Sequence, residues 1–340
     1  MLFVFSKHTR TLGRTHRRRA NQRKALSSFL SPNSYHMSCF LWIKLYIDIY
    51  METILEIKLT QGLCNKLFMF FSACDIAINK NIKLLEPKFG WKKPILFSEI
   101  YDLEKFNSSM KAYNNGQDIL IPFEYRSNYT IIRNNVNLWN YSEKILEKNR
   151  QECKLLKNCM NIIVLQCLQL NENNQKIAEQ NINKEINSVH LRLESDWQKY
   201  SKSAQKRIDS NERILIDLDT FIELYNELFN EHIFFTSGEN HEAITNKFSS
   251  RNIKSNSYFN SNFEYEINAA INFEICCHSE KFIGLSRSTF SNLITLKRFL
   301  NGNDNSYIYN LNNTILQRID AGLQCNAICA ISKKTSILDY

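Results

Sequence analysis

The chain has 340 residues, of which 44% are hydrophobic and 12% aromatic. This content supports a buried core and excludes a chain that is disordered throughout, and the length allows one large domain or two ordinary ones. Residues 1–50 hold nine Lys or Arg against one acid, and so account for nearly all of the net charge of +9. The rest of the chain is close to neutral, and we therefore expect no nucleic-acid partner.

Residues 1–50 are a basic leader that we do not assign to the fold. Their Arg-rich, acid-poor composition is typical of a mitochondrial transit peptide, and the block 16–24 could equally be a nuclear-import or nucleic-acid patch. A third interpretation is an upstream extension, with translation starting at Met51. The apolar stretch 39–50 is interrupted by two charges and is too short to span a bilayer, so we expect no transmembrane segment.

The pattern after the leader is that of an α/β protein. Residues 53–59 alternate as a strand does, Gly62 marks a turn, and residues 65–79 have the periodicity of an amphipathic helix. The next strand covers residues 82–85. A strand, a glycine turn, a helix and a second strand together are the opening of a doubly wound parallel sheet.

The second half of the chain repeats this alternation. Residues 141–170 are expected to be helical, and the polar stretch 171–187 is the candidate interdomain linker or long surface loop. Later strands are predicted at 188–193, 232–236 and 281–285, and later helices at 219–229, 264–277 and 291–300, the first of them capped by Asp219. We therefore predict two Rossmann-like α/β domains facing a cleft, at 51–180 and 188–315, followed by a tail at 316–340.

The ten cysteines follow no disulfide-framework spacing, so we expect buried thiols. The run Cys276-Cys277-His278 could suggest a metal site, but it lacks a second pair of ligands. We therefore predict no metal.

The first segment that could carry chemistry is the turn at 62–67. Gly62 would let the backbone approach a ligand closely, and the start of the following helix offers free N–H donors. Asn65 would project its amide into the same space, whereas we expect Lys66 on the helix surface. The alternative interpretation is an ordinary turn.

The second segment is 189–197. On a strand, His190, Arg192 and Glu194 share one face, and three polar groups on one face of a short buried strand are costly unless they line a site. Arg192 suits a diphosphate because a guanidinium is permanently charged and makes forked hydrogen bonds. The alternative is a structural Arg–Glu pair on an edge strand.

The third segment is 282–291, where a strand delivers hydroxyl groups to the start of a helix. These are the side chains of Ser286, Ser288, Thr289 and Ser291. Hydroxyls beside the free N–H groups of a helix form a phosphate cradle. The alternative is N-capping by Ser288 or Ser291, although four hydroxyls are more than a cap requires.

Together the three segments resemble the GDP-fucose protein O-fucosyltransferase superfamily, including its large plant branch. The run from His190 to Asp196 matches the plant-like pattern H-L-R-x-E-x-D at every defining position, and the likeness extends over residues 53–300 in consistent order. The resemblance implies a glycosyltransferase fold of the B type, with 51–180 on the acceptor side and 188–315 binding the nucleotide sugar. It also implies that fucose moves from GDP-fucose, with inversion, to a hydroxyl of a protein Ser/Thr or a glycan acceptor, without a metal or other cofactor.

The resemblance also implies a role for individual residues. Arg192 would hold the β-phosphate of the departing GDP, Asn65 would lie near the reacting centre, and Glu194 or Asp196 would be the general base. The residues implied to bind the donor are Gly62, His190, Asn272, Ser288, Thr289 and Phe290.

Asn272 departs from the family pattern, because members commonly have an acid there that suits the guanine edge. An amide cannot accept two hydrogen bonds as a carboxylate does. This departure favours two alternatives: a transferase that uses another nucleotide sugar, or a catalytically degenerate glycan- or nucleotide-binding protein of the same fold. The family often works in the secretory lumen, but the lack of a recognisable signal or anchor favours a cytoplasmic location here.

Overall fold

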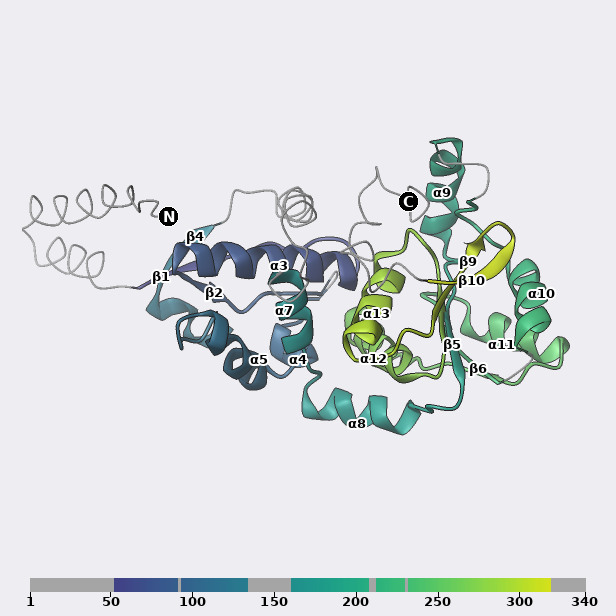
Figure 1. Ribbon diagram of the computed structural model, residues 1–340. Coiled ribbons are helices and arrows are strands. Elements are labelled where there is room, and N and C mark those ends of the chain that lie inside the picture. The colour runs from purple at the N-terminus through teal and green to yellow at the C-terminus, as the bar shows by residue number, and fades with distance from the viewer. Residues whose placement is uncertain (1–51, 91–92, 134–159, 208–211, 230–231, 319–340) are drawn as a thin grey trace, which may run out of the picture. The chain divides into compact units, whose positions relative to one another are not determined.

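The structure is a computed structural model that describes residues 52–90, 93–133, 160–207, 212–229 and 232–318 (Figure 1). Residues from Thr53 onward belong to one compact unit. They contain a four-stranded and a six-stranded sheet, with helical segments between successive strands except the last two, so the predicted α/β class is confirmed. The predicted leader lies outside the described residues, and the domain boundaries at 180 and 315 stay predictions.

The first sheet consists of short parallel strands in the order β3-β2-β1-β4. Its strands are β1 (Thr53–Glu56), β2 (Lys83–Leu85), β3 (Leu120–Ile121) and β4 (Thr130–Arg133). In the central strand, Ile54 is in register with Lys83 on one side and Ile131 on the other. Parallel neighbours require crossover connections, which the helices supply. The predicted doubly wound opening is therefore confirmed, although β1 is shorter than the predicted strand.

Helix α3 (Leu63–Lys80) carries the chain from the glycine turn into the core. Gly62 occupies its N-cap position, and the helix ends at Asn81, whose left-handed backbone lets its N–H bond the carbonyls of the last turn. The helix begins two residues earlier than predicted. Asn65 consequently lies in its first turn, beside the N–H groups that have no partner within the helix.

The other helices of the first part are short. They are α4 (Phe97–Ile100), α5 (Leu103–Met110), α7 (Met160–Cys167), and the 3-10 turns η1 (Lys111–Tyr113) and η2 (Phe123–Asn128). Asp102 starts α5, because its side chain accepts a hydrogen bond from the backbone N–H of Lys105 at 2.9 Å. Of the predicted helix at 141–170, α7 is confirmed, and 141–159 lies outside the described residues.

The long-surface-loop alternative for 171–187 is wrong, because most of the stretch forms helix α8 (Glu172–Asn181), whereas the interdomain-linker alternative stays a prediction. Asn171 caps this helix by accepting a hydrogen bond from the N–H of Asn174. The Asn174 side chain in turn donates to two backbone carbonyls at the end of α4. Polar anchors of this kind leave no hydrophobic periodicity, so the sequence pattern could not indicate the helix.

The second sheet has the order β10-β9-β8-β5-β6-β7 and is parallel except for the β9–β10 hairpin. Its strands are β5 (Asn187–His190), β6 (Ile233–Thr236), β7 (Ser255–Asn256), β8 (Phe282–Gly284), β9 (Ser306–Leu311) and β10 (Thr314–Gln317). Strand β5 ends at His190, earlier than predicted. Arg192 and Glu194 therefore lie on the turn beyond the carboxyl end of a central strand.

Six helical segments accompany the second sheet. They are α9 (Ser195–Ala204), η4 (Gln205–Arg207), α10 (Leu218–Leu228), α11 (His241–Ser250), α12 (Tyr265–His278) and α13 (Thr289–Leu300). The predicted capping of α10 by Asp219 is wrong: Asp217 accepts the capping bond from Thr220 N–H, while Asp219 pairs with Lys247 and Arg251. Within the described ranges, no helix combines the length and apolarity needed to cross a membrane.

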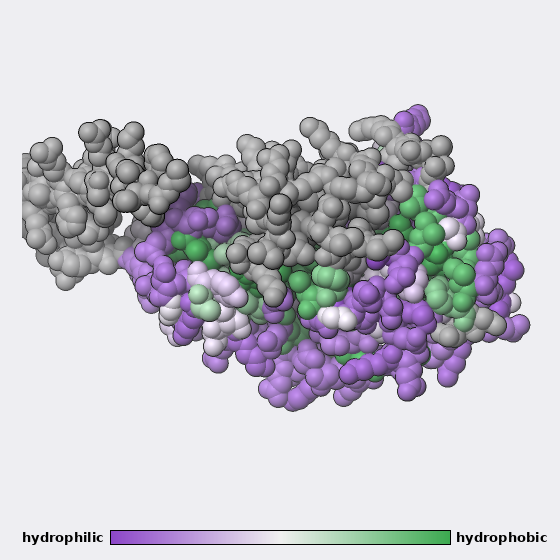
Figure 2. Space-filling model, viewed as in Figure 1, coloured by the Kyte–Doolittle hydropathy of each residue, from purple (hydrophilic) through white to green (hydrophobic). Residues whose placement is uncertain are grey.

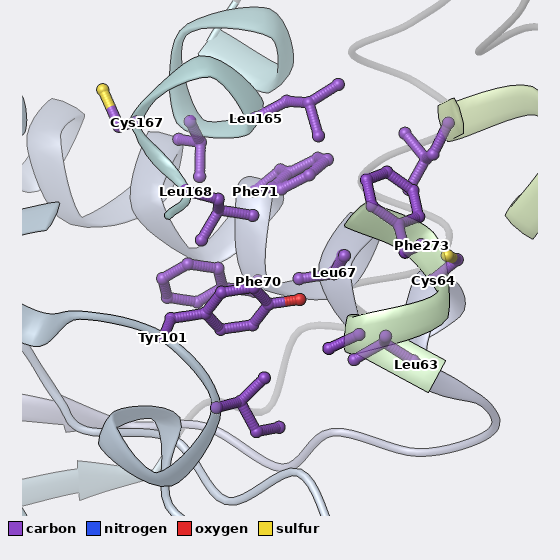
Figure 3. Packing of buried hydrophobic residues seen from close by; sticks show 14 of the residues in the cluster. Leu63, Cys64, Leu67, Phe70, Phe71, Tyr101, Leu165, Cys167, Leu168 and Phe273 are labelled. Atoms are coloured by element: carbon purple, nitrogen blue, oxygen red, sulfur yellow. The ribbon is translucent and has the colours of Figure 1, made fainter. Parts of the chain in front are cut away.

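The largest cluster of buried apolar side chains joins helices from both parts of the chain. Figure 3 shows Phe71 of α3 beside Leu165 of α7 and Phe70 of α3 beside Tyr101, with Phe273 of α12 in the same cluster. On the face shown in Figure 2, hydrophilic residues cover most of the surface that is not grey. This shared core includes Leu55 of β1 and Phe282 of β8, so it packs the two sheets that carry the site described next against the same helices.

Candidate functional site

Two cavities, of about 250 and 720 Å³, lie beyond the carboxyl ends of β1, β5 and β8. All nine residues predicted to form the site line one or both of them. His190, Glu194 and Asn272 line the smaller cavity, Gly62, Asn65, Ser288 and Thr289 line the larger, and Arg192 and Phe290 line both. Segments more than 200 residues apart in the sequence thus meet at the strand ends, where open α/β sheets bind ligands.

Arg192 lies between the two cavities. Its guanidinium stacks on the Trp197 ring, with the central carbon 4.6 Å from the ring centroid. Its Nη2 is 3.6 Å from Asp196 Oδ2, and its Nε is 3.3 Å from Glu194 Oε2 but is not aligned for a hydrogen bond. The guanidinium is therefore held in place by stacking and by charge, while N–H groups remain free for a ligand.

Glu194 connects Arg192 to the turn after β6. Its Oε1 accepts a hydrogen bond of 2.7 Å from the backbone N–H of Gly238. A Cβ at position 238 would lie 2.8 Å from the same oxygen, so only glycine allows this close approach. Because its other oxygen faces Arg192, the buried carboxylate spans the gap between two loops at the cavity wall.

His190, the last residue of β5, is buried behind Phe290, with ring centroids 4.7 Å apart. Its Nδ1 is 2.9 Å from the hydroxyl of Ser291, which also accepts a hydrogen bond from Leu285 N–H. Burial and then the positive charge of Arg192 lower the pKa of His190 well below its ordinary value. The imidazole is therefore neutral at neutral pH and adds no charge to the site.

The four hydroxyls at the start of α13 have different environments. Ser286 bonds the buried carboxylate of Glu212, and Ser291 faces His190. Ser288 occupies the N-cap position without a side-chain capping bond, and its hydroxyl is 3.5 Å from His190 Nδ1. The Thr289 hydroxyl has no hydrogen-bond partner within the part of the chain that the structure describes. Ser288 is thus the N-cap residue, as the capping interpretation has it, but without the side-chain bond of a cap, and Ser288 and Thr289 both line the larger cavity.

Asn272 is buried on α12 with its amide fixed in orientation. Its Nδ2 donates to the backbone carbonyls of Tyr258 and Asn268, at 3.0 and 2.8 Å. Both protons are thus used, while Oδ1 is buried without a partner at the wall of the smaller cavity. A buried carbonyl oxygen without a donor costs free energy that a bound N–H group would recover.

The turn before α3 presents a second unpaired amide oxygen. Asn65 Nδ2 donates to Gln61 Oε1 at 2.7 Å, and Asn65 Oδ1 is buried without a hydrogen-bond partner. Lys66, expected on the helix surface, is instead buried and bonds both the carbonyl of Phe89 and the carboxylate of Glu266. That expectation was wrong because the partner of Lys66 lies 200 residues away in the sequence, where no local pattern reveals it.

The smaller cavity has an aromatic wall that no sequence motif indicated. Phe259, Phe263, Tyr265 and His241 line it. The His241 ring stacks on Phe259 with centroids 5.2 Å apart, and burial lowers the pKa of His241. Phe259 is 59% exposed, which is unusual for a phenylalanine that packs against other rings. The signal available was four aromatic residues within the Asn- and Ser-rich stretch 255–265.

The described cysteines are free and buried: Cys64, Cys74, Cys167, Cys276 and Cys277. Burial raises their pKa, to about 12 for Cys276, so the prediction of buried thiols is confirmed for these five. Among the residues with described positions, no three His, Cys, Asp or Glu side chains are grouped to hold a metal ion.

No protein-family model matches the sequence, and no curated protein matches it. Solved structures do match. The apo form of POFUT1 aligns with a TM-score of 0.50 at 13% identity, covering 76% of this chain and 97% of that chain. The fucosyltransferase NodZ from Bradyrhizobium aligns with a TM-score of 0.51 at 10% identity, covering 79% and 99%. These likenesses confirm the predicted fold class, two Rossmann-like domains of the glycosyltransferase B type.

Proposed function

We propose that this protein is an inverting glycosyltransferase that moves fucose from GDP-fucose to a hydroxyl of a protein Ser/Thr or glycan acceptor. One observation carries the proposal: Arg192, with unused N–H donors, lies between two cavities lined by every residue that the fucosyltransferase resemblance singles out. The fold likeness to the fucosyltransferase NodZ supports it.

In the proposed complex the nucleoside lies in the smaller cavity, between the aromatic wall and Asn272. The diphosphate reaches Arg192 and the start of α13, where a cation and free N–H groups balance its charge. The fucosyl group and the acceptor share the larger cavity with Asn65 and Thr289. This division assigns donor recognition to the second sheet and the acceptor side to the turn after β1.

The proposed reaction is a direct displacement at the anomeric carbon. The acceptor oxygen forms the new bond to that carbon from the face opposite the diphosphate, while the bond to the β-phosphate oxygen breaks and GDP leaves with the electron pair. Negative charge grows on the phosphate in the transition state, so a preorganised guanidinium is the largest stabilising contribution. Arg192 supplies this charge, and the proposal needs no metal.

The proton of the acceptor hydroxyl must go to a carboxylate or to solvent. Glu194, the predicted base, has one oxygen bonded to Gly238 and the other facing Arg192, and it does not line the larger cavity. Asp196 lines the larger cavity and its side chain is 77% exposed. We therefore assign the proton to Asp196 and a positioning role to Glu194.

A second candidate is transfer from another nucleotide sugar, and Asn272 favours it. With both amide protons used, Asn272 offers one acceptor. One acceptor can pair with N–H groups of several bases, whereas two adjacent acceptors would suit the paired donors of guanine.

Calorimetric titration of the full-length protein with GDP, GDP-fucose, UDP and ADP tests both candidates. Selective GDP binding that weakens about 100-fold in Arg192→Ala supports the fucosyltransferase. Tighter binding of UDP or ADP keeps the transferase and replaces the donor. The proposal is wrong if no nucleotide binds.

A further inference from the structure

Gln61, at the mouth of the larger cavity, has an unusual backbone conformation. Its φ is 73°, in the left-handed region that favours glycine. Six other non-glycine residues in the described part of the chain have positive φ, and all six are Asn, the residue that tolerates it best: Asn81, Asn115, Asn240, Asn252, Asn312 and Asn313. Glutamine lacks this tolerance, so the left-handed backbone of Gln61 is strained.

The Gln61 side chain holds the amide of Asn65. Gln61 Oε1 accepts the hydrogen bond from Asn65 Nδ2 at 2.7 Å, across the start of α3. Gly62, between them, offers no side chain to cap the helix. The bond fixes which end of the Asn65 amide turns away from Gln61, and the end left over is Oδ1, buried without a partner.

We propose that Gln61 is a positioning residue for the transfer reaction, which holds Asn65 Oδ1 as the acceptor for the hydroxyl proton of the incoming group. The inference rests on the proposed function. The amide takes no proton: it accepts a hydrogen bond, and so points a lone pair of the hydroxyl oxygen at the anomeric carbon. When the new carbon–oxygen bond forms and the bond to the diphosphate breaks, the hydroxyl proton leaves its hydrogen bond with Asn65 Oδ1 and passes through solvent to Asp196, which lines the same cavity.

A strained residue at a site is informative because its strain and its contact have opposite expected effects: the strain costs stability, whereas the contact supports activity. In Gln61→Gly the backbone is relaxed and the bond to Asn65 is lost. In Gln61→Glu the strained backbone and an acceptor for Asn65 Nδ2 are both kept, and the carboxylate cannot donate. If Gln61 serves only the turn, Gln61→Gly should lose no activity. If Gln61 positions Asn65, Gln61→Glu should keep the activity and Gln61→Gly should lose it.

The experiment compares the full-length wild type with Gln61→Gly and Gln61→Glu. Asn115→Gly, at an exposed left-handed position away from both cavities, is the matched control. Water serves as the acceptor, and GDP release from GDP-fucose is measured with the GDP dissociation constant and the melting temperature. We expect Gln61→Gly to keep its melting temperature within about 2 °C and its GDP affinity, but to lose about 10- to 100-fold in kcat. Gln61→Glu should keep kcat within about 3-fold.

An unchanged kcat in Gln61→Gly, or an equal loss in both variants, overturns the proposal. A readout without turnover is the exchange rate of the Asn65 side-chain amide protons, followed by NMR and identified by their absence in Asn65→Asp. We expect slow exchange in the wild type and in Gln61→Glu, and fast exchange in Gln61→Gly. Equal exchange rates in the wild type, Gln61→Gly and Gln61→Glu overturn the inference. Failure of GDP to bind the wild type overturns the proposed function instead, and the exchange rates then show only whether Gln61 holds the Asn65 amide.

Discussion

Two arginines near the second sheet differ in how their donors are used. Arg298 on α13 is fully buried, and its guanidinium donates to five backbone carbonyls, those of Cys276, Cys277, Ser279, Glu280 and Asn305. It closes the carboxyl end of α12 and ties it to the starts of β8 and β9. Arg192 is stacked and ion-paired, but Nε has no hydrogen-bond partner and its edge faces two cavities.

The same difference separates two buried asparagines. Asn107 donates to Leu120 O and accepts from the N–H groups of Ile119 and Leu120, so both ends of its amide are used. Asn272 uses its two protons and leaves Oδ1 without a partner. Full use of hydrogen-bonding groups is what a structural role requires, and unused groups at a cavity wall are what a ligand can complete.

The largest expected effect is the loss of the Arg298 contacts. Arg298→Met removes every donor to the buried carbonyls, and we expect the free energy of unfolding to fall by about 4 kcal/mol. Urea unfolding followed by circular dichroism measures it. The control is Arg251→Met on the exposed end of α11, because its solvent-exposed pair with Asp219 should contribute little to stability. Similar losses in both variants would contradict the structural role of Arg298.

The second-largest expected effect is a loss of stability in acid, at the buried carboxylate of Glu274. Burial alone would raise the pKa of Glu274, but the hydrogen bond from His278 and the charge of Lys297 lower it to about 2. An acid whose folded-state pKa lies below its ordinary value stabilises the fold above that ordinary value, and the stability is lost as pH falls toward 2. We expect about 3 kcal/mol of unfolding free energy to disappear between pH 5 and pH 2.

Urea unfolding at a series of pH values checks this expectation. Glu274→Gln should be less stable than the wild type at pH 6 and equal to it near pH 2. A difference that stays constant across this range would mean that the carboxylate charge is not what Lys297 and His278 stabilise.

Arg192→Lys keeps the positive charge at position 192 but removes the guanidinium N–H donors that are left unused in the structure. Lysine cannot present forked donors to a diphosphate, so we expect kcat for GDP release from GDP-fucose to fall about 100-fold. The free energy of unfolding should change by no more than about 1 kcal/mol, because the exposed edge of Arg192 makes no bond that the fold needs. If Arg192→Lys has a normal kcat and a lowered stability, Arg192 has a structural role like that of Arg298, and the contrast between the two arginines is wrong.

The sequence predicted the fold class and the convergence of three segments because both depend on local signals. The glycine turn, the polar run from His190 to Glu194 and the hydroxyl cluster before α13 each stand out against their neighbours. Strand-end topology then brings such segments together without further information. The roles of the nine residues are not decided by their positions and stay predictions.

The remaining features depend on partners that are far away in the sequence. Arg298 looks like any cation in the last turn of an amphipathic helix, and nothing local shows that five carbonyls surround it. The pairing of Lys66 with Glu266 is likewise not visible in the local sequence of either residue. The choice of Asp217 over Asp219 as the cap of α10 depends on where Lys247 and Arg251 lie, because these cations engage Asp219. Local patterns place elements, but they do not show which polar groups are paired.

The smallest expected effect is at two serines. The hydroxyl of Ser237 is buried at the smaller cavity without a partner, whereas that of Ser188 bonds the Ser279 hydroxyl at 2.6 Å. Ser237→Ala should weaken GDP binding about 5-fold with no loss of stability, since one neutral hydrogen bond to the ligand is removed. Ser188→Ala should lower the unfolding free energy by about 1 kcal/mol and leave GDP affinity unchanged. Calorimetry measures the GDP affinity of both variants, and urea unfolding measures their stability. The comparison fails if the two substitutions change GDP affinity and stability to the same extent.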